Sequence, residues 1–208
     1  MKVTTILTFI LIGFIGNAQV VVDSINAKIY VDRVQEIELD KNELQEKTNR
    51  WVAKNYNNSK YVTRINNEDN ILIKGAFDVG ADFSAFGATL YSERKVEYTL
   101  DLKFKDGKYK IDISDLLFDG IDATRALSVY FMSYDEYKTF SLKAMEEYDG
   151  MGKKAAIKRI NNDDKFRKDY ESQQNYGKKI IPQIVDKLSQ IDLSLLSYLK
   201  NQDMKDEW

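Results

Sequence analysis

The chain has 208 residues, a formal net charge of −2, and neither cysteine nor histidine. These absences exclude disulfide bonds, zinc sites built from thiolates or imidazoles, and Cys–His or Ser–His–Asp catalysis. Acidic and basic residues are interspersed along the chain, so no broad basic field is available to attract nucleic acid or an anionic lipid surface.

The first 18 residues have the pattern of a cleavable secretion signal. Lys2 follows the amino terminus, residues 6–15 form an almost uninterrupted apolar run, and small residues lead up to a cleavage site after Ala18. The alternatives are a membrane anchor, which needs about 20 apolar residues, and a buried amphipathic helix, which would show polar residues at helical spacing. We therefore expect an exported mature chain that begins at Gln19 and is not inserted in a membrane; periplasmic and secreted destinations both fit.

The first elements of the mature chain are a strand, a helix and a hairpin. A strand-like segment ends near residue 39, and Asp40 followed three residues later by Glu43 is typical of a helix N-terminus. The spacing of its apolar residues predicts a helix over 41–56. Two strands, 61–65 and 71–79, flank the polar stretch 66–70, which has the composition of a hairpin loop.

The clearest strand signal lies over residues 96–104, where apolar and polar residues alternate. Asp106-Gly107 then predicts a tight type I′ turn, because both central residues of that turn need a positive φ and Asp-Gly tolerates it. A further strand continues over residues 109–113 with the same apolar face. Together these segments indicate a sheet with one buried face and one face open to water.

The remainder of the chain has helical patterns. Residues 133–148 carry aromatic residues at helical spacing, residues 149–177 have the composition of a polar connector, and Pro182 is suited to be the first residue of a last helix. Apolar residues in that helix recur at intervals of four and three, namely Ile184, Leu188, Ile191, Leu195 and Tyr198. This seam favours packing on the chain's own sheet, with pairing between two copies through residues 182–199 as the alternative.

Several of these segments resemble an uncharacterised family of exported bacterial proteins. The resemblance covers roughly residues 30–118 and depends on the helix segment Trp51-Val52-Ala53-Lys54-Asn55-Tyr56, on Ile73-Lys74-Gly75 and on the hairpin from Tyr98 through Asp106-Gly107-Lys108-Tyr109. That family is described as a domain of unknown function with a fold like the TATA-box-binding protein. The resemblance implies an α+β fold, in which a curved antiparallel sheet has helices on one face.

The domain organisation that we predict has three parts. Residues 1–18 are the signal peptide, residues 19–120 are the TBP-like α+β domain, and residues 121–208 are a C-terminal helical extension packing on or beside it. The TATA-box-binding protein places its open face in a DNA minor groove. Here the equivalent positions have alternating charges and no apolar wedge, so we expect no nucleic-acid partner.

Two groups of residues are candidates for ligand binding. The first is aromatic and lies among glycines between residues 75 and 91; it comprises Phe77, Phe83, Phe86 and Tyr91. These rings either form a binding loop or fold back onto the core from a long hairpin connection, and core burial is the commoner use. The second is the open sheet face, for which the alternation predicts Glu97, Thr99, Asp101, Lys103, Lys110 and Asp112.

Other constellations carry weaker signals. Tyr130, Phe131, Tyr134 and Tyr137 suggest a core or subunit contact. Residues 161–164, Asn-Asn-Asp-Asp, offer oxygen ligands but lack the pattern of a calcium loop, so a solvated loop is expected. Carboxylate pairs such as Asp112 with Asp115 are too common to indicate acid–base catalysis. We predict no catalytic residues, no metal site and no cofactor.

The function class that these patterns favour is a non-enzymatic binding or interaction module of the cell envelope, whose partner is a protein or a small ligand. Two alternatives remain. One is a hydrolase that uses carboxylates or a Ser/Lys pair, which needs neither histidine nor cysteine. The other is a structural protein that associates with itself.

Overall fold

The computed structural model describes residues 19–56, 62–85, 88–119 and 126–201. The signal segment 1–18, Tyr61 and Phe86 lie outside these ranges. Within them, no helix is long and apolar enough to cross a membrane.

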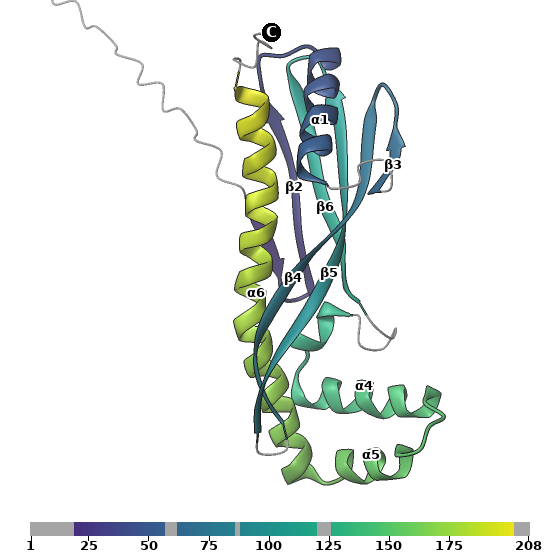
Figure 1. Cartoon of the computed structure of the whole chain (residues 1–208). Helices are drawn as coiled ribbons and strands as arrows, with labels where there is room; N and C mark the ends of the chain where they lie inside the picture. Colours follow the sequence, from purple (N-terminus) through teal and green to yellow (C-terminus); the bar gives the residue numbers. More distant parts are fainter. Residues whose placement is uncertain (1–18, 57–61, 86–87, 120–125, 202–208) are drawn as a thin grey trace, which may run out of the picture.

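The core of the fold is a six-stranded antiparallel sheet with the strand order β1-β2-β6-β5-β4-β3 (Figure 1). Its strands are β1 (Val20–Asp23), β2 (Lys28–Glu36), β3 (Thr63–Asn66), β4 (Asn70–Ala85), β5 (Ala88–Lys105) and β6 (Lys108–Phe118). The alternation predicted for 96–104 and 109–113 is confirmed: these apolar residues lie on one face, where all of them are buried. The predicted fold class, an α+β fold with helices on one face of an antiparallel sheet, is confirmed.

Helix α1 (Lys41–Asn55) begins where its N-terminal signal predicts. The Asp40 side chain accepts a hydrogen bond from the Glu43 amide, and the Glu43 side chain accepts one from the Asp40 amide. This capping box satisfies two amides that have no partner within the helix. The buried side of α1 includes Leu44 and Trp51, and the Trp51 indole donates to Ser194 Oγ at 3.0 Å.

The turn between β5 and β6 has the predicted length but not the predicted type. Lys105 pairs with Lys108, so Asp106 and Gly107 form a two-residue loop. Only Gly107 has a positive φ, of 75°. The type I′ prediction was wrong because the turn is bonded to the segment before α1: Asp106 Oδ1 accepts from the Lys41 amide, and Gly107 bonds with the backbone of Ile37 and Leu39.

Strands β4 and β5 form a hairpin much longer than predicted. Their pairing is continuous from Asn70–Lys103 to Ala85–Ala88, so residues 75–85 and 88–91 are regular strand and not a connecting loop. Gly75 and Gly80 make this possible: a Cβ atom at either position would lie 2.3 Å from the ring or hydroxyl of Tyr98 or Tyr91, respectively. Glycines that look like loop residues in the sequence are therefore places where aromatic rings cross a strand.

The C-terminal part of the chain contains a short 3₁₀ helix, η1 (Leu127–Tyr130), and three α-helices, α4 (Tyr134–Glu147), α5 (Lys153–Ile160) and α6 (Asp163–Lys200). The predicted helix 133–148 is confirmed, with Ser133 and Glu136 forming a capping box. The predicted polar connector was wrong, because α5 and the first half of α6 occupy it. Helix α6 begins at Asp163, and Pro182 lies inside it on an exposed side, where water can hydrate the carbonyl that proline leaves without a donor.

Helix α6 covers the apolar face of the sheet together with α1 (Figure 1). At 1.5 Å per residue its 38 residues extend about 57 Å. Of the predicted seam, Ile184, Leu188 and Leu195 are fully buried, and Ile191 and Tyr198 are partly buried against the same core. The seam side chains are thus packed inside this chain.

One buried ion pair connects α6 to β2 on this apolar side. The Arg33 guanidinium donates through Nε and a terminal nitrogen to the two oxygens of Asp192, at 2.9 and 2.6 Å. The Asp192 side chain has 0% exposure and that of Arg33 has 14%. Burial lowers the pKa of Arg33, but its bonds to Asp192 raise that pKa by more. Such bidentate pairing fixes one geometry between strand and helix.

We expect Asp192→Ala to lower the free energy of unfolding by about 3–5 kcal/mol, because it leaves the Arg33 charge buried without a partner. The double variant Arg33→Met/Asp192→Leu should regain most of the loss, since it removes both charges. Urea unfolding monitored by circular dichroism measures both. Asp186→Ala, at an exposed position of the same helix, should stay within about 0.5 kcal/mol of the parent; a similar loss there would contradict this account.

Candidate functional site

The open face of the sheet, opposite α1 and α6, carries rows of polar side chains across the strands. Asp112 on β6 lies between two direct cross-strand neighbours, Asp32 on β2 and Asp101 on β5. Like charges directly opposite each other destabilise a sheet. The acidic row, as we call Asp32, Asp112 and Asp101, is therefore a costly arrangement that packing alone does not explain.

Two lysines of the same face compensate part of this charge. Lys110 Nζ lies 2.7 Å from Asp32 Oδ1, and Lys103 Nζ lies 3.3 Å from Asp101 Oδ2. The hydrogen bond with Asp32 is the main reason why the pKa of Lys110 is raised. The Asp112 side chain makes no hydrogen bond or close ion pair with any residue in the described ranges.

A bulge in β6 shapes the next part of the face. Glu97 pairs with Leu117 but Thr99 pairs with Ser114, so β6 has one extra residue between them. Asp115 takes up that residue with a φ of 54°, a left-handed conformation that aspartate tolerates better than most residues. Its carboxylate accepts a hydrogen bond from Thr99 Oγ1 at 2.9 Å and lies 3.7 Å from Lys74 Nζ.

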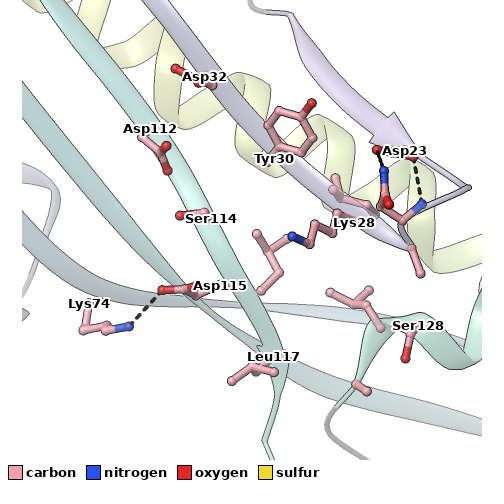
Figure 2. A pocket seen from close by; sticks show the side chains of 16 residues that line it. Asp23, Lys28, Tyr30, Asp32, Lys74, Asp112, Ser114, Asp115, Leu117 and Ser128 are labelled. Atoms are coloured by element: carbon pink, nitrogen blue, oxygen red, sulfur yellow. Dashed lines mark hydrogen bonds and ion pairs between the residues drawn. The ribbon is translucent and has the colours of Figure 1, made fainter.

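Next to the bulge is a groove of about 740 Å³ (Figure 2). It lies between the turn that joins β1 to β2, the second half of β6 and η1. Asp23 bonds across this turn: it accepts hydrogen bonds from the backbone amides of Ile25 and Asn26 and from the Asn26 side chain. The Asn26 side-chain bond is the main cause of the lowered pKa of Asp23.

The groove offers both signs of charge, hydroxyls and apolar surface. Lys28 extends across it toward the strand that carries Ser114 and Asp115 (Figure 2). Apolar lining comes from both sides, with Leu117 on β6 and Leu127 on η1. The full polar lining comprises Asp23, Asn26, Lys28, Tyr30, Asp32, Lys74, Asp112, Ser114, Asp115 and Ser128.

The structure places all six residues predicted for the open face on that face. Asp101 and Asp112 belong to the acidic row, and Lys103 and Lys110 are its lysine neighbours. Thr99 donates a hydrogen bond to Asp115, and Glu97 lies opposite Leu117. Only Asp112 of these six lines the groove. Their role in binding stays a prediction.

Several groove residues were missed by sequence reasoning. Tyr30 and Asp32 alternate with the buried residues Ile29 and Val31, so the two-residue period of 28–36 could have located this strand. Lys74 could have been placed by the same alternation in β4. The bulge at Asp115 has no comparable signal, because nothing in the local sequence marks the extra residue.

The aromatic candidates do not come together as a site. Phe77 packs beside Tyr98 with ring centroids 5.7 Å apart, and Phe83 meets Tyr176 edge-on at 5.8 Å. Tyr91 lies on the hairpin with 67% of its surface exposed, and Phe86 is outside the described residues. Two of the four rings thus pack against the core, as expected of rings that fold back.

The two weaker constellations have structural contacts. Tyr130 is buried, and Tyr137 stacks on Phe166 with centroids 5.5 Å apart. In the segment 161–164, Asn162 caps α6, and Asp163 accepts hydrogen bonds from Tyr134 and Lys138. Among the described residues, no group of three or more carboxylates is arranged to hold a metal ion.

The pair formed by Asp32 and Lys110 gives a prediction about titration. We expect Asp32→Asn to lower the pKa of Lys110 toward the ordinary lysine value of about 10.4, because the variant removes the carboxylate. Since the folded-state pKa is the raised one, the pair stabilises the fold fully below about pH 10 and this contribution is lost as pH rises through the folded-state pKa. NMR titration of the lysine side chains measures the shift.

Glu147→Gln, an exposed position on α4, serves as the control for that titration. It removes the same charge far from Lys110 in the sequence and should leave the Lys110 curve unchanged. An equal shift in both variants would mean that the net charge, and not Asp32, sets the pKa.

Comparisons with known proteins identify the fold. The family described as "Domain of unknown function (DUF4468) with TBP-like fold" matches residues 30–119 of the chain. The resemblance seen in the sequence is confirmed in its family and its fold. None of the curated proteins matches this chain.

Two crystal structures are similar to the chain. A DUF4468 family protein from Bacteroides ovatus has 12% sequence identity and a TM-score of 0.48, over 92% of this chain and 95% of that one. A TBP-like protein from Parabacteroides distasonis has 13% identity and a TM-score of 0.42, over 85% of this chain and 95% of that one. Likeness at this level carries no information about activity.

Proposed function

We propose that this chain, which a TBP-like family matches over residues 30–119, is a non-enzymatic binding protein of the cell envelope that holds its ligand on the open sheet face. The observation that carries the proposal is the groove of about 740 Å³ beside the β6 bulge. Its volume is within the range of small-molecule sites, about 300–1,000 Å³. Helices α1 and α6 lie on the opposite face and leave it accessible (Figure 1).

The charges of the groove suggest what kind of ligand it takes. Most of its carboxylates already have partners: Asp32 pairs with Lys110, Asp115 with Thr99, and Asp23 with its own turn. Asp112 on one side and Lys28 on the other make no side-chain hydrogen bond or ion pair with the described residues. Lys28 is the cross-strand neighbour of Asp23, and Asp112 interacts electrostatically with Lys110, but neither Lys28 nor Asp112 is hydrogen-bonded through its side chain to a described residue. Two such opposite charges on a groove suit a zwitterionic ligand.

The rest of the lining supports a short peptide or amino-acid derivative as that ligand. The hydroxyls of Tyr30, Ser114 and Ser128 can donate to or accept from peptide groups. Leu117 and Leu127 provide apolar surface for a side chain. Mixed linings of this kind, with a few polar groups that fix orientation, are typical of ligand sites.

A hydrolytic function would have its best nucleophile in Thr99, whose hydroxyl lies between Lys74 and Asp115. Threonine serves as a nucleophile where a base activates it. However, Thr99 is only 7% exposed, so a substrate carbonyl would have little room to approach its Oγ1. The contact geometry therefore favours a structural role for Thr99 in holding the bulge, and a binding role for the groove.

Titration of residues 19–208 with a panel of amino acids, dipeptides and tripeptides tests the ligand assignment. We expect amide NMR signals of residues 28–32 and 112–117 to shift. Asp112→Asn and Lys28→Gln should each weaken binding by up to about fivefold, because each removes one charge from an exposed ion pair worth up to about 1 kcal/mol.

Asp78→Asn, an exposed aspartate on β4 outside the groove lining, is the matched control and should bind as the parent does. The proposal would be refuted if the shifts fell on α1 and α6, or if no member of the panel bound while an ester, glycan or peptide was turned over.

The envelope location is supported by the signal pattern of residues 1–18. We expect the full chain, expressed in a Gram-negative host, to be recovered from the periplasm or the medium with Gln19 as its first residue. Mass spectrometry of the intact protein measures the start. Replacing Leu11 by Arg should stop export, because a charge interrupts the apolar run; a cytoplasmic protein that keeps Met1 in the parent would contradict the assignment.

A further inference from the structure

The hairpin end of the open face concentrates positive charge. The register of β5 and β6 puts Lys103 opposite Lys110 and Lys105 opposite Lys108. All four lysines alternate with buried residues and so lie on the open face. Two successive like-charged pairs on one hairpin are unusual in a chain with a net charge of −2, because like charges directly opposite each other repel. We call these four residues the lysine end.

Only part of this charge is neutralised within the chain. Lys110 pairs with Asp32 and Lys103 with Asp101. Lys105 and Lys108 make no side-chain hydrogen bond or ion pair with residues of the described segments. The one carboxylate between them in the sequence, Asp106, accepts a hydrogen bond from the backbone of Lys41.

A hollow of about 640 Å³ adjoins the lysine end. It is lined by Lys41, Asp69, Asn70, Lys103, Phe104, Lys105, Asp106 and Lys108. Asp69 is paired with Lys41 at 2.5 Å, so its charge is already compensated. The N-terminus of α1 arrives at the same place through the bond between Lys41 and Asp106, and the helix dipole adds positive potential there.

We propose that the lysine end and its hollow bind an anionic polysaccharide. Successive lysines along each strand are about 7 Å apart, since a strand rises about 3.4 Å per residue. Two parallel rows at this spacing fit a single chain that carries repeated negative charges. The hydroxyls of sugar units can donate to Asp69 and Asp106, whereas a chain made only of phosphates offers no such donors.

Broader anionic partners fit this surface less well. Glu36 is the direct cross-strand neighbour of Lys108, and Glu36 and Glu38 line a hollow with Asp106 and Lys108 at the β2 side of the lysine end. A flat anionic membrane would meet these carboxylates together with the lysines. A nucleic-acid duplex laid along the open face would meet the acidic row. A narrow, flexible chain reaches the lysines and avoids both.

Binding of residues 19–208 to immobilised polygalacturonate and dextran sulfate, with neutral dextran as the blank, tests the proposal. We expect binding at low salt that weakens as salt is added, and no binding to neutral dextran. The variant Lys105→Gln/Lys108→Gln should weaken binding about tenfold or more, since it removes both unpaired cations. Its midpoint of urea unfolding should be unchanged or higher, because the variant also removes a repulsion.

The matched control is Lys154→Gln/Lys158→Gln on α5, which removes two exposed positive charges elsewhere on the chain. An equal loss in this control would overturn the proposal, because it would show attraction by net charge alone. Failure to bind either polysaccharide would also overturn it. So would tighter binding to phosphatidylglycerol vesicles or to duplex DNA than to the polysaccharides. Because Lys105 and Lys108 lie outside the groove lining, this result is independent of the peptide titration.

Discussion

The apolar face of the sheet has to be removed from water, and helix α6 does most of this. Its buried residues extend from Phe166 to Leu199, and it contacts β4 as well as β1 and β2. Burial of this kind is the main favourable term in folding. The Arg33–Asp192 pair then fixes how α6 is rotated about its own axis relative to the strands. In any other rotation, both charges would lose their partner.

The same helix also protects the long β4–β5 hairpin. The Gln183 side-chain amide accepts from the Gly80 amide at 3.2 Å and donates to the Gly80 carbonyl at 2.9 Å, as a neighbouring strand would. Gly177 allows close packing, since a Cβ there would lie 2.6 Å from the Tyr130 ring. An edge covered in this way is less able to pair with other chains. Because α1 and α6 occupy one face, the polar face is left free for partners.

The distribution of charge on the free face differs from that of a surface built to enter a DNA minor groove. The TATA-box-binding protein reads a minor groove with polar side chains and apolar wedges. Here Asp101 and Asp112 occupy the middle of the face, and the lysines lie toward the β5–β6 turn. Both arrangements place like charges side by side at a cost to stability. Such a cost is typical of surfaces retained for function rather than for folding.

The features of the fold and the site that could be predicted are those that a local pattern of residues marks in the sequence. The strands 96–104 and 109–113, the helix that begins after Asp40 and the open-face residues from Glu97 to Asp112 followed from periodicity and capping. The segment 149–177 was mistaken for a connector because its charged residues hide a helical spacing of Phe166, Tyr170, Gln173 and Gly177. Gly80 was mistaken for a residue of the connection because the ring that crosses it, that of Tyr91, comes from the paired strand, whereas Gly75 already lay within the predicted strand 71–79.

The sequence by itself determined the class of fold, the two-sided character of the sheet, the export signal pattern and the absence of histidine and cysteine chemistry. These depend on residue type and on short periods, which are read within a few residues. Only the tertiary structure decided that Asp32 and Asp101 flank Asp112, that Asp115 forms a bulge against Thr99, and that a groove opens beside Lys28. Each depends on strand order and register between segments far apart in the chain, and no local pattern encodes them.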